Sequence, residues 1–262
     1  MNKPVVLLDP GHGGYDPGAA YNGLKEKDLN LMLALKVAER LDGVKVLLTR
    51  ERDSYVSLSD RVALSRRAEP DLFLSLHANA GGGRGFESFI YRGLGAMDPA
   101  VKMQEALHKR IMDALGRWQI VDRGRKTAAF YVLKYNSCPA VLIESLFLDN
   151  VREAGIWREP VFADTLAGGV VKGIEAALGV DGDGDGAGDG KVNTPTPTLP
   201  SQGGVSSSGG NVAGPPTEAP AARQRLYTVQ VGAFAYLENA RQRLAEAQAA
   251  GFNDAYIYQK MI

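Results

Sequence analysis

Residues 140–147 read AVLIESLF, a nearly continuous apolar run that is interrupted by a single carboxylate, Glu144. Apolar residues at both odd and even positions are typical of a β-strand that is covered on both faces. Further apolar runs with the length of a strand occur at residues 5–9, 44–49, 72–77 and 87–91. The run at 140–147 therefore predicts a central strand in a sheet with both faces buried.

Helical patterns alternate with these apolar runs along the chain. In residues 25–41, apolar side chains recur at steps of three and four residues and form one apolar face. The other helix candidates are residues 58–68, 99–115 and 159–178. Alternating strands and helices predict an α/β fold, with a mainly parallel twisted sheet and helices on both of its faces. We expect this domain to span residues 1–180.

The composition changes after this domain. Residues 181–222 are rich in Gly, Pro, Ser and Asp and contain no aromatic residue. Such a segment buries too little apolar surface to offset the entropy of ordering it, so we expect a flexible linker. In residues 223–262, the run YTVQVGAF (227–234) alternates like a strand, and a helix pattern and a second strand pattern follow. This end of the chain predicts a small βαβ segment.

The overall composition excludes several classes of protein. The chain has 262 residues with 30 basic and 30 acidic side chains, so its net charge is zero. We expect no nucleic-acid partner, since that function needs a basic surface. We expect no membrane partner, because every apolar run is far shorter than the ~20 residues that span a bilayer. The single cysteine, Cys138, cannot form an intrachain disulfide, and we expect it at the edge of the core.

Four residues with catalytic chemistry lie near the ends of the predicted strands. His12 follows the first strand, His77 ends the third, and Glu144 is at the end of the last, while Glu26 begins the first helix. In an open α/β sheet, the functional site lies outside the carboxyl ends of the strands. We therefore expect these side chains to converge, although they are far apart in the sequence.

Two imidazoles and one carboxylate are a frequent ligand set of catalytic Zn²⁺, with the fourth position left for water. His12, Glu26 and His77 fit the ligand role, and Glu144 fits a base that moves a proton from water to a leaving amine. The alternative is that none of them binds a metal: His12 would be a turn residue, His77 a strand residue and Glu26 a solvated residue at the start of a helix. Glu144 favours function, because a carboxylate in an apolar strand is costly to bury without a partner. His108, on a polar helix, is expected at the surface.

The motifs of residues 4–178 resemble the Amidase_3 family of zinc-dependent N-acetylmuramoyl-L-alanine amidases, which are bacterial cell-wall hydrolases. The motifs that carry the resemblance are LDPGHGG (8–14), Asp16, Glu26 with Asn30, Thr49-Arg50 with Asp53, LSDR (58–61), DLFLSLHAN (71–79) and PAVLIE (139–144). The resemblance implies Zn²⁺ held by His12, Glu26 and His77, with Glu144 as the catalytic carboxylate. It also implies cleavage of the amide between N-acetylmuramic acid and the L-alanine of the stem peptide in peptidoglycan.

Two motifs depart from the family pattern. The family usually has Thr-Gly after the catalytic glutamate, where this chain has Ser145-Leu146, and often Ala-Asn before the third strand, where this chain has Ser65-Arg66-Arg67. Neither departure involves an expected zinc ligand, but both could alter the fit of the substrate. The chain also lacks the autoinhibitory helix insert of some division amidases, so we expect an open site.

Residues 223–262 resemble the first half of a SPOR domain, a peptidoglycan-binding repeat, in the run YTVQVGAF and in Ala240. This half is either a truncation or a unit that needs a second copy to complete its sheet. The N-terminus shows no secretory pattern. We therefore expect a cytoplasmic protein that reaches the cell wall on lysis or by non-classical export, as in mother-cell lysis during sporulation or in phage release. Its protein partners are unknown.

Two other functions are compatible with the same residues. A zinc peptidase would cut within the stem peptide with the same metal chemistry. A non-catalytic peptidoglycan-binding protein would retain a degenerate amidase domain, although the presence of all four chemical residues argues against this hypothesis.

Overall fold

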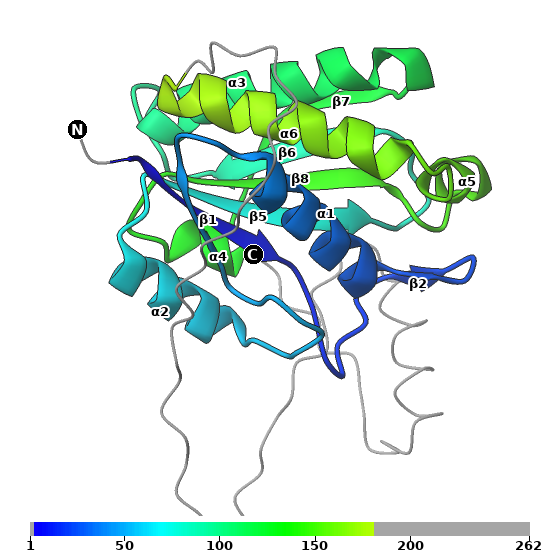
Figure 1. Cartoon of the computed structure of the whole chain (residues 1–262), viewed down its shortest axis with the longest axis horizontal. Helices are drawn as coiled ribbons and strands as arrows, with labels where there is room; N and C mark the ends of the chain where they lie inside the picture. Colours follow the sequence, from blue (N-terminus) through cyan, green and yellow to red (C-terminus); the bar gives the residue numbers. More distant parts are fainter. Residues whose placement is uncertain (1–2, 181–262) are drawn as a thin grey trace, which may run out of the picture. The chain divides into compact units, whose positions relative to one another are not determined.

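The computed structural model describes residues 3–180 of the chain (Figure 1). The predicted linker (181–222) and the predicted tail (223–262) lie outside the described residues. Within residues 3–180, a six-stranded sheet has the strand order β4-β1-β5-β8-β6-β7. Its strands are β1 (Val5–Pro10), β4 (Lys45–Leu48), β5 (Leu72–Asn79), β6 (Phe86–Tyr91), β7 (Asp122–Ala128) and β8 (Ala140–Phe147). A small ribbon of β2 (Ala20–Tyr21) and β3 (Leu24–Lys25) precedes the first helix.

The sheet is mainly parallel, as predicted. β1 pairs in parallel with β4 and β5, and β5 pairs in parallel with β8. β6 reverses this direction, because it is antiparallel to β8 and parallel to β7. β8 lies between β5 and β6, which explains its nearly continuous apolar sequence.

Helices cover both faces of this sheet, and the predicted α/β fold is confirmed. They are α1 (Glu26–Arg40), α2 (Leu58–Ala68), α3 (Pro99–Leu115), α4 (Tyr131–Lys134), α5 (Val151–Trp157) and α6 (Phe162–Leu178), with a 3₁₀ turn at Gly116–Trp118. Side chains of α1, α3 and α6 share the larger core with Leu74 of β5, whereas α2 and α4 share the smaller core with Phe73. Figure 1 shows α3 and α6 on one side of the sheet and α2 on the other.

The starts of α2 and α3 are fixed by side chains just before each helix. Ser57 precedes α2, and its hydroxyl accepts a hydrogen bond from the backbone N–H of Asp60. Asp98 precedes α3, and its carboxylate accepts one from the N–H of Ala100. These bonds satisfy N–H groups that have no partner within the helix. The Ser57 cap determines where the loop after β4 ends, and this loop borders the candidate site.

Several elements differ from the sequence-based expectations. β7, α4 and α5 were not predicted, and α6 begins at Phe162 rather than at residue 159. β7 has a polar sequence, DRGRKTA, because it lies at the edge of the sheet and pairs with β6 on one side only. Glu144 is the fifth of the eight residues of β8 and lies inside the strand, not at its end. None of the helices within residues 3–180 is long and apolar enough to cross a lipid bilayer.

Candidate active site and metal centre

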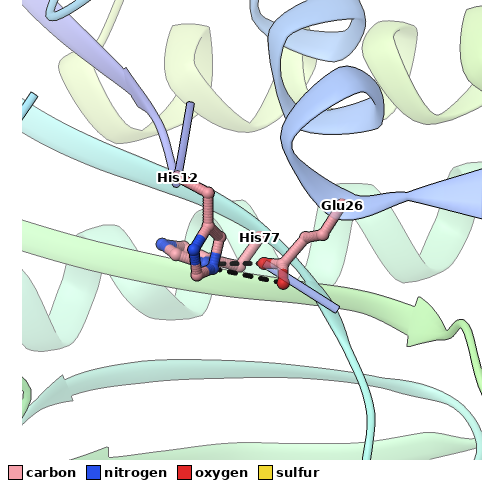
Figure 2. A group of neighbouring side chains, drawn as sticks. All are labelled: His12, Glu26 and His77. Carbon is pink, nitrogen blue, oxygen red and sulfur yellow. Dashed lines mark hydrogen bonds and ion pairs between the residues drawn. The ribbon is translucent and has the colours of Figure 1, made fainter. Parts of the chain in front are cut away.

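His12, Glu26 and His77 come from three separate segments and meet at one point (Figure 2). His12 lies in the loop after β1, Glu26 is the first residue of α1, and His77 lies near the end of β5. The Nε2 atom of His12 is 3.2 Å from Oε2 of Glu26, and Nδ1 of His77 is 2.9 Å from Oε1 of the same carboxylate. One ligand atom from each residue lies within 4.8 Å of the others. The predicted convergence is therefore present.

The ring of His12 is oriented by a carboxylate on its far side. Nδ1 of His12 lies 2.8 Å from Oδ2 of Asp16, and the other oxygen of Asp16 accepts a hydrogen bond from the N–H of Gly18. A carboxylate at Nδ1 favours a proton on that nitrogen, so Nε2, which points at Glu26, is the nitrogen that would bind a metal ion. His12 itself has a φ of 59°, a left-handed conformation that directs its side chain toward the cluster.

The carboxylate of Glu26 is held by the backbone around it. The N–H of Ala19 donates to Oε2 at 2.8 Å, and the N–H of Ala78 donates to Oε1 at 3.2 Å. Burial alone raises the pKa of Glu26, but the two histidines outweigh it and move this pKa below its usual range. Glu26 thus stays ionised although it is only 5% exposed. Its place in the first turn of α1 also favours the negative charge.

The donor set and its surroundings fit a bound Zn²⁺ ion. Burial lowers the pKa of His12, but the carboxylates of Glu26 and Asp16 outweigh it and raise this pKa to about 10, which shows how strongly negative the potential is at the cluster. Two nitrogens and one carboxylate oxygen are a preferred Zn²⁺ ligand set. The backbone leaves room for them, because a Cβ atom on Gly11 would lie 2.2 Å from the ring of His77. A Cβ atom on Gly18 would lie 2.5 Å from Oε2 of Glu26.

Glu144 lies beside this cluster on the neighbouring strand. It is opposite His77 in the register of β5 and β8, so the two side chains lie on the same face of the sheet. Its Oε2 atom is buried and has no hydrogen-bond partner within residues 3–180. Burial, followed by the charges of Glu26 and Glu87, raises the pKa of Glu144 well above its usual range. A carboxyl group with a strongly perturbed pKa beside a ligand cluster is a candidate for proton transfer.

Comparison with known proteins agrees with this arrangement. The sequence model of the N-acetylmuramoyl-L-alanine amidases matches residues 6–176, nearly all of the described domain. The chain belongs to the N-acetylmuramoyl-L-alanine amidase family. The predicted family and its amidase activity are thus confirmed. A second match, to the SPOR domain, covers residues 224–261.

The similar curated proteins include two amidases of Bacillus. The sporulation-specific N-acetylmuramoyl-L-alanine amidase of Bacillus subtilis is 38% identical over 252 residues, which cover 95% of this chain and 82% of the relative. The amidase CwlM of Bacillus licheniformis is 36% identical over 97% of this chain and 85% of its own length. Both alignments extend well beyond the catalytic domain.

Solved amidase structures share the described fold. The N-acetylmuramoyl-L-alanine amidase of Clostridium difficile 630 superposes with a TM-score of 0.64 at 31% identity, over 70% of this chain and all of that one. The catalytic domain of CwlV from Bacillus (Paenibacillus) polymyxa gives a TM-score of 0.62 at 31% identity, over 68% of this chain and 99% of that one. The part of this chain that these superpositions do not cover is about as long as the segment that follows the amidase domain.

The sequence analysis did not single out Glu87 for the amidase site. Glu87 lies on β6 opposite Glu144, so His77, Glu144 and Glu87 form a row across three strands. Burial raises the pKa of Glu87, but Lys126 and Arg123 outweigh it, and the pKa falls below its usual value. Asn79 donates a hydrogen bond to the same carboxylate at 2.7 Å. A carboxylate directly after Phe86, at the first position of the predicted strand 87–91, was the signal that could have identified it.

The loop that carries His12 is supported by a buried ion pair. Arg61 of α2 bonds the carboxylate of Asp9 and donates to the carbonyl of His12 at 2.8 Å. Thr49 and Ser75 also donate to Asp9, at 2.7 and 2.8 Å. Burial raises the pKa of Asp9, but Arg61 and these hydrogen bonds outweigh it and lower the pKa. These residues belong to the amidase motifs of the sequence, and the structure gives them this supporting position.

The departure at Ser145-Leu146 from the usual amidase pattern has a clear structural setting. The hydroxyl of Ser145 donates to the carbonyl of His77 at 2.8 Å, as a threonine hydroxyl could. Leu146 has a φ of 59°, which glycine adopts freely and leucine does not. The side chain of Leu146 is fully buried in the larger core. The strain of this backbone is therefore offset by apolar burial that glycine would not supply.

Two predictions outside the amidase site can also be compared with the structure. His108 was predicted at the surface, and this was wrong. It is 6% exposed, and its ring lies 2.8 Å from the hydroxyl of Ser88 and 2.9 Å from the carboxylate of Asp122. Its helix, α3, packs on both β6 and α6, so less of the helix faces solvent than its polar sequence indicated. Cys138 is half-buried beside the smaller core, as expected.

Proposed function

We propose that the chain is a zinc-dependent amidase that cleaves the bond between the lactyl group of N-acetylmuramic acid and L-alanine in peptidoglycan. His12, Glu26 and His77 hold the Zn²⁺ ion, and Glu144 is the catalytic carboxylate. This proposal rests on one observation, the cluster of the three donor side chains with Glu144 beside it. Three donor groups face one another, and next to them lies the carboxylate of Glu144, whose buried Oε2 atom has no hydrogen-bond partner among the described residues.

The proposed mechanism assigns a separate task to each group. Zn²⁺ supplies a Lewis acid, which polarises the amide carbonyl and makes water a stronger acid. Glu144 lies beside the ligand cluster, where a carboxylate can act first as a general base and then as a general acid. Glu144 takes a proton from the attacking water at a carboxylate oxygen. It then donates this proton to the amide nitrogen of L-alanine, which leaves as an amine.

The rest of the chain would direct the enzyme to its substrate. Residues 1–180 are the catalytic domain, 181–222 the linker and 223–262 the peptidoglycan-binding segment. This division is supported by the family matches to 6–176 and 224–261 and by the composition of the residues between them. The enzyme would act at the cell wall, in line with the activity of its relatives, which include a sporulation-specific amidase.

Mass spectrometry of the fragments released from purified peptidoglycan tests the proposal. The zinc-loaded chain should release free stem peptides that begin with L-alanine and leave the glycan strands intact. A zinc chelator should abolish this release. Fragments cut within the stem peptide would instead support the peptidase, and no release from several wall types would support the non-catalytic binding protein.

The variant Glu144→Gln tests the role of the carboxylate. We expect activity to fall by about 10²- to 10⁴-fold, the usual contribution of a general acid–base group. Zinc content should be unchanged, because Glu144 is not one of the proposed ligands. The matched control is Glu105→Gln, which replaces a solvent-exposed glutamate of α3 and should leave activity unchanged. Activity of Glu144→Gln equal to the wild type would exclude Glu144 from the reaction.

A further inference from the structure

We propose that the stacked side chains of Tyr15 and Tyr55 form the binding platform for an N-acetylhexosamine ring of the glycan strand. This inference rests on the proposed function and adds the site at which the glycan strand would bind. The two rings lie 4.2 Å apart between centroids, with an angle of 25° between their planes. Tyr15 is 79% exposed and Tyr55 is 44% exposed, so the stack presents aromatic surface to solvent.

The tyrosine stack is joined directly to the loop that carries a metal ligand. Tyr15 lies between His12 and Asp16, and the backbones of Gly13 and Asp16 exchange two hydrogen bonds around it. Asp16 in turn bonds the ring of His12. The backbone that carries Tyr15 is thus held close to the metal centre by a short, closed turn.

Tyr55 belongs to the loop after β4, which is tied to the same turn. The carboxylate of Asp53 accepts a hydrogen bond from the N–H of Gly14 at 2.7 Å and pairs with Lys27 at 2.6 Å. Lys27 also donates to the carbonyl of Gly14 at 2.8 Å. Two loops that are about 40 residues apart in the sequence are therefore fixed together, and little freedom is lost when a ligand binds to their aromatic surface.

The chemistry of this surface fits a sugar. One face of a pyranose ring presents C–H groups, and the face of an aromatic ring is electron-rich, so the two stack without any charge. In peptidoglycan, the lactyl carboxyl of muramic acid is consumed in the amide bond, and the glycan strand is neutral there. The stem peptide, in contrast, carries free carboxylates.

The other side of the metal centre fits the peptide. Across the sheet, Tyr55 follows β4 and Tyr15 follows β1, before His77 on β5 and Glu144 on β8. Beyond them, Arg123 and Lys126 of β7 share one carboxylate, that of Glu87, which leaves an excess of positive charge. An anionic peptide would lie on this cationic side, with the scissile amide over the metal centre. The neutral glycan would then lie on the tyrosines.

The test uses the full chain loaded with zinc and compares three double variants. Tyr15→Ala/Tyr55→Ala removes the platform, and Tyr15→Phe/Tyr55→Phe keeps the rings but removes the hydroxyls. The matched control is Tyr131→Ala/Tyr135→Ala, which removes a second pair of half-exposed, neighbouring tyrosine rings at the start of α4 and just after its end. The substrates are soluble muropeptides with one stem peptide and glycan strands of increasing length.

We expect the alanine pair to raise KM about three- to tenfold on the longer glycans while kcat stays within about twofold. The phenylalanine pair and the α4 control should behave as the wild type, and zinc content should be equal in all variants. The increase in KM should diminish as the glycan is shortened, and a change from tripeptide to pentapeptide stems should not affect it.

Three results would overturn the inference. Wild-type KM in the alanine pair would show that the rings do not bind substrate. Loss of zinc or of kcat at unchanged KM would show that the rings only support the His12 loop. An increase in KM that depends on the stem peptide instead of the glycan would place the peptide on the tyrosines. Failure of the proposed function is distinguishable, because the wild-type chain would then release no stem peptide beginning with L-alanine.

Discussion

At the scale of single residues, the candidate site depends on groups that hold the donors in place. His12 is oriented by Asp16, Glu26 by the N–H groups of Ala19 and Ala78, and the loop of His12 by Arg61. A side chain that only orients a ligand should alter metal affinity without removing the ligand itself. This distinction can be tested at Asp16.

We predict that Asp16→Asn weakens Zn²⁺ binding by about 10- to 100-fold, the usual cost of removing a partner of a ligating histidine. The reason is that an amide orients the His12 ring less strongly than a carboxylate and does not increase its basicity. Competition with a chromophoric chelator measures the affinity. Asp42→Asn, at a solvent-exposed aspartate, is the control. Equal affinity of Asp16→Asn and the wild type would contradict the orienting role.

A second prediction concerns Asp9, whose carboxylate is 1% exposed and paired with Arg61. Asp9→Asn should lower the free energy of unfolding at pH 7 by about 3–5 kcal/mol, since it leaves the buried guanidinium without its counter-charge. Denaturant unfolding in zinc-free buffer measures this loss.

The same variant should change the dependence of stability on pH. The pKa of Asp9 is lowered in the folded state, so its contribution is fully present above the unfolded pKa of about 4 and is lost as the pH falls through the lower, folded value. Asp9→Asn should therefore lose less stability than the wild type when the pH falls below about 4. If both lose stability with the same slope, the buried pair does not contribute to acid sensitivity.

At the scale of helices and strands, the close contact between α3 and α6 depends on the small residues of α6. A Cβ atom on Gly173 would lie 2.9 Å from the Cα atom of Leu107, which is backbone and cannot move aside. A Cβ atom on Gly168, in the same helix, would meet nothing within 4 Å. The two glycines thus have the same helix propensity and opposite packing environments.

We predict opposite effects for alanine at these two positions. Gly168→Ala should stabilise the domain by up to about 1 kcal/mol, because alanine loses less backbone entropy in a helix. Gly173→Ala should destabilise it by about 1–2 kcal/mol, since the cost of overpacking exceeds the gain in helix propensity. Thermal and denaturant unfolding of the two variants measure the difference. A Gly173→Ala variant that is more stable than Gly168→Ala would show that α3 and α6 can separate at little cost.

The elements that the sequence predicted share strong local signals. α2 and α3 begin with capping side chains and have one apolar face, and β8 is apolar on both faces, so their bounds agree with the expected ones. β7 could not be predicted, because its pairing with β6 is long-range and its outer edge favours charged residues. α4 is a single turn with no room for a periodic pattern.

The same reasoning applies to the candidate site. His12, Glu26, His77 and Glu144 could be singled out because they lie near the ends of predicted strands or one loop away and because their local motifs resemble those of the amidase family; of the four, only Glu144 is unusual for its position, an apolar strand. Glu87 could not, since its relevance depends on β6 running antiparallel to β8, which aligns it with Glu144. The burial of His108 likewise depends on α3 packing against elements on two sides.

At the scale of the whole molecule, the candidate metal centre joins segments from the first half of the described domain. We predict that zinc raises its free energy of unfolding by about 2.7 kcal/mol when free zinc exceeds Kd by about 100-fold. For a domain of this size, the shift corresponds to a Tm increase of about 5–10 °C. Thermal unfolding with and without a chelator measures it, and His77→Ala should show no difference. An unchanged Tm in the wild-type chain would contradict metal binding at this site.

The hydrogen bonds around Glu26 and His12 also have a consequence for whether the chain folds before or after it binds metal. Each donor group is held by the backbone or by a carboxylate of the protein itself, so we expect the chain to reach its native fold before any ion binds. In this respect it differs from zinc fingers, which are unfolded without their metal. Synthesis and activation would then be separate steps. A folded, metal-free pool could accumulate harmlessly, and the local zinc supply would decide when wall degradation begins.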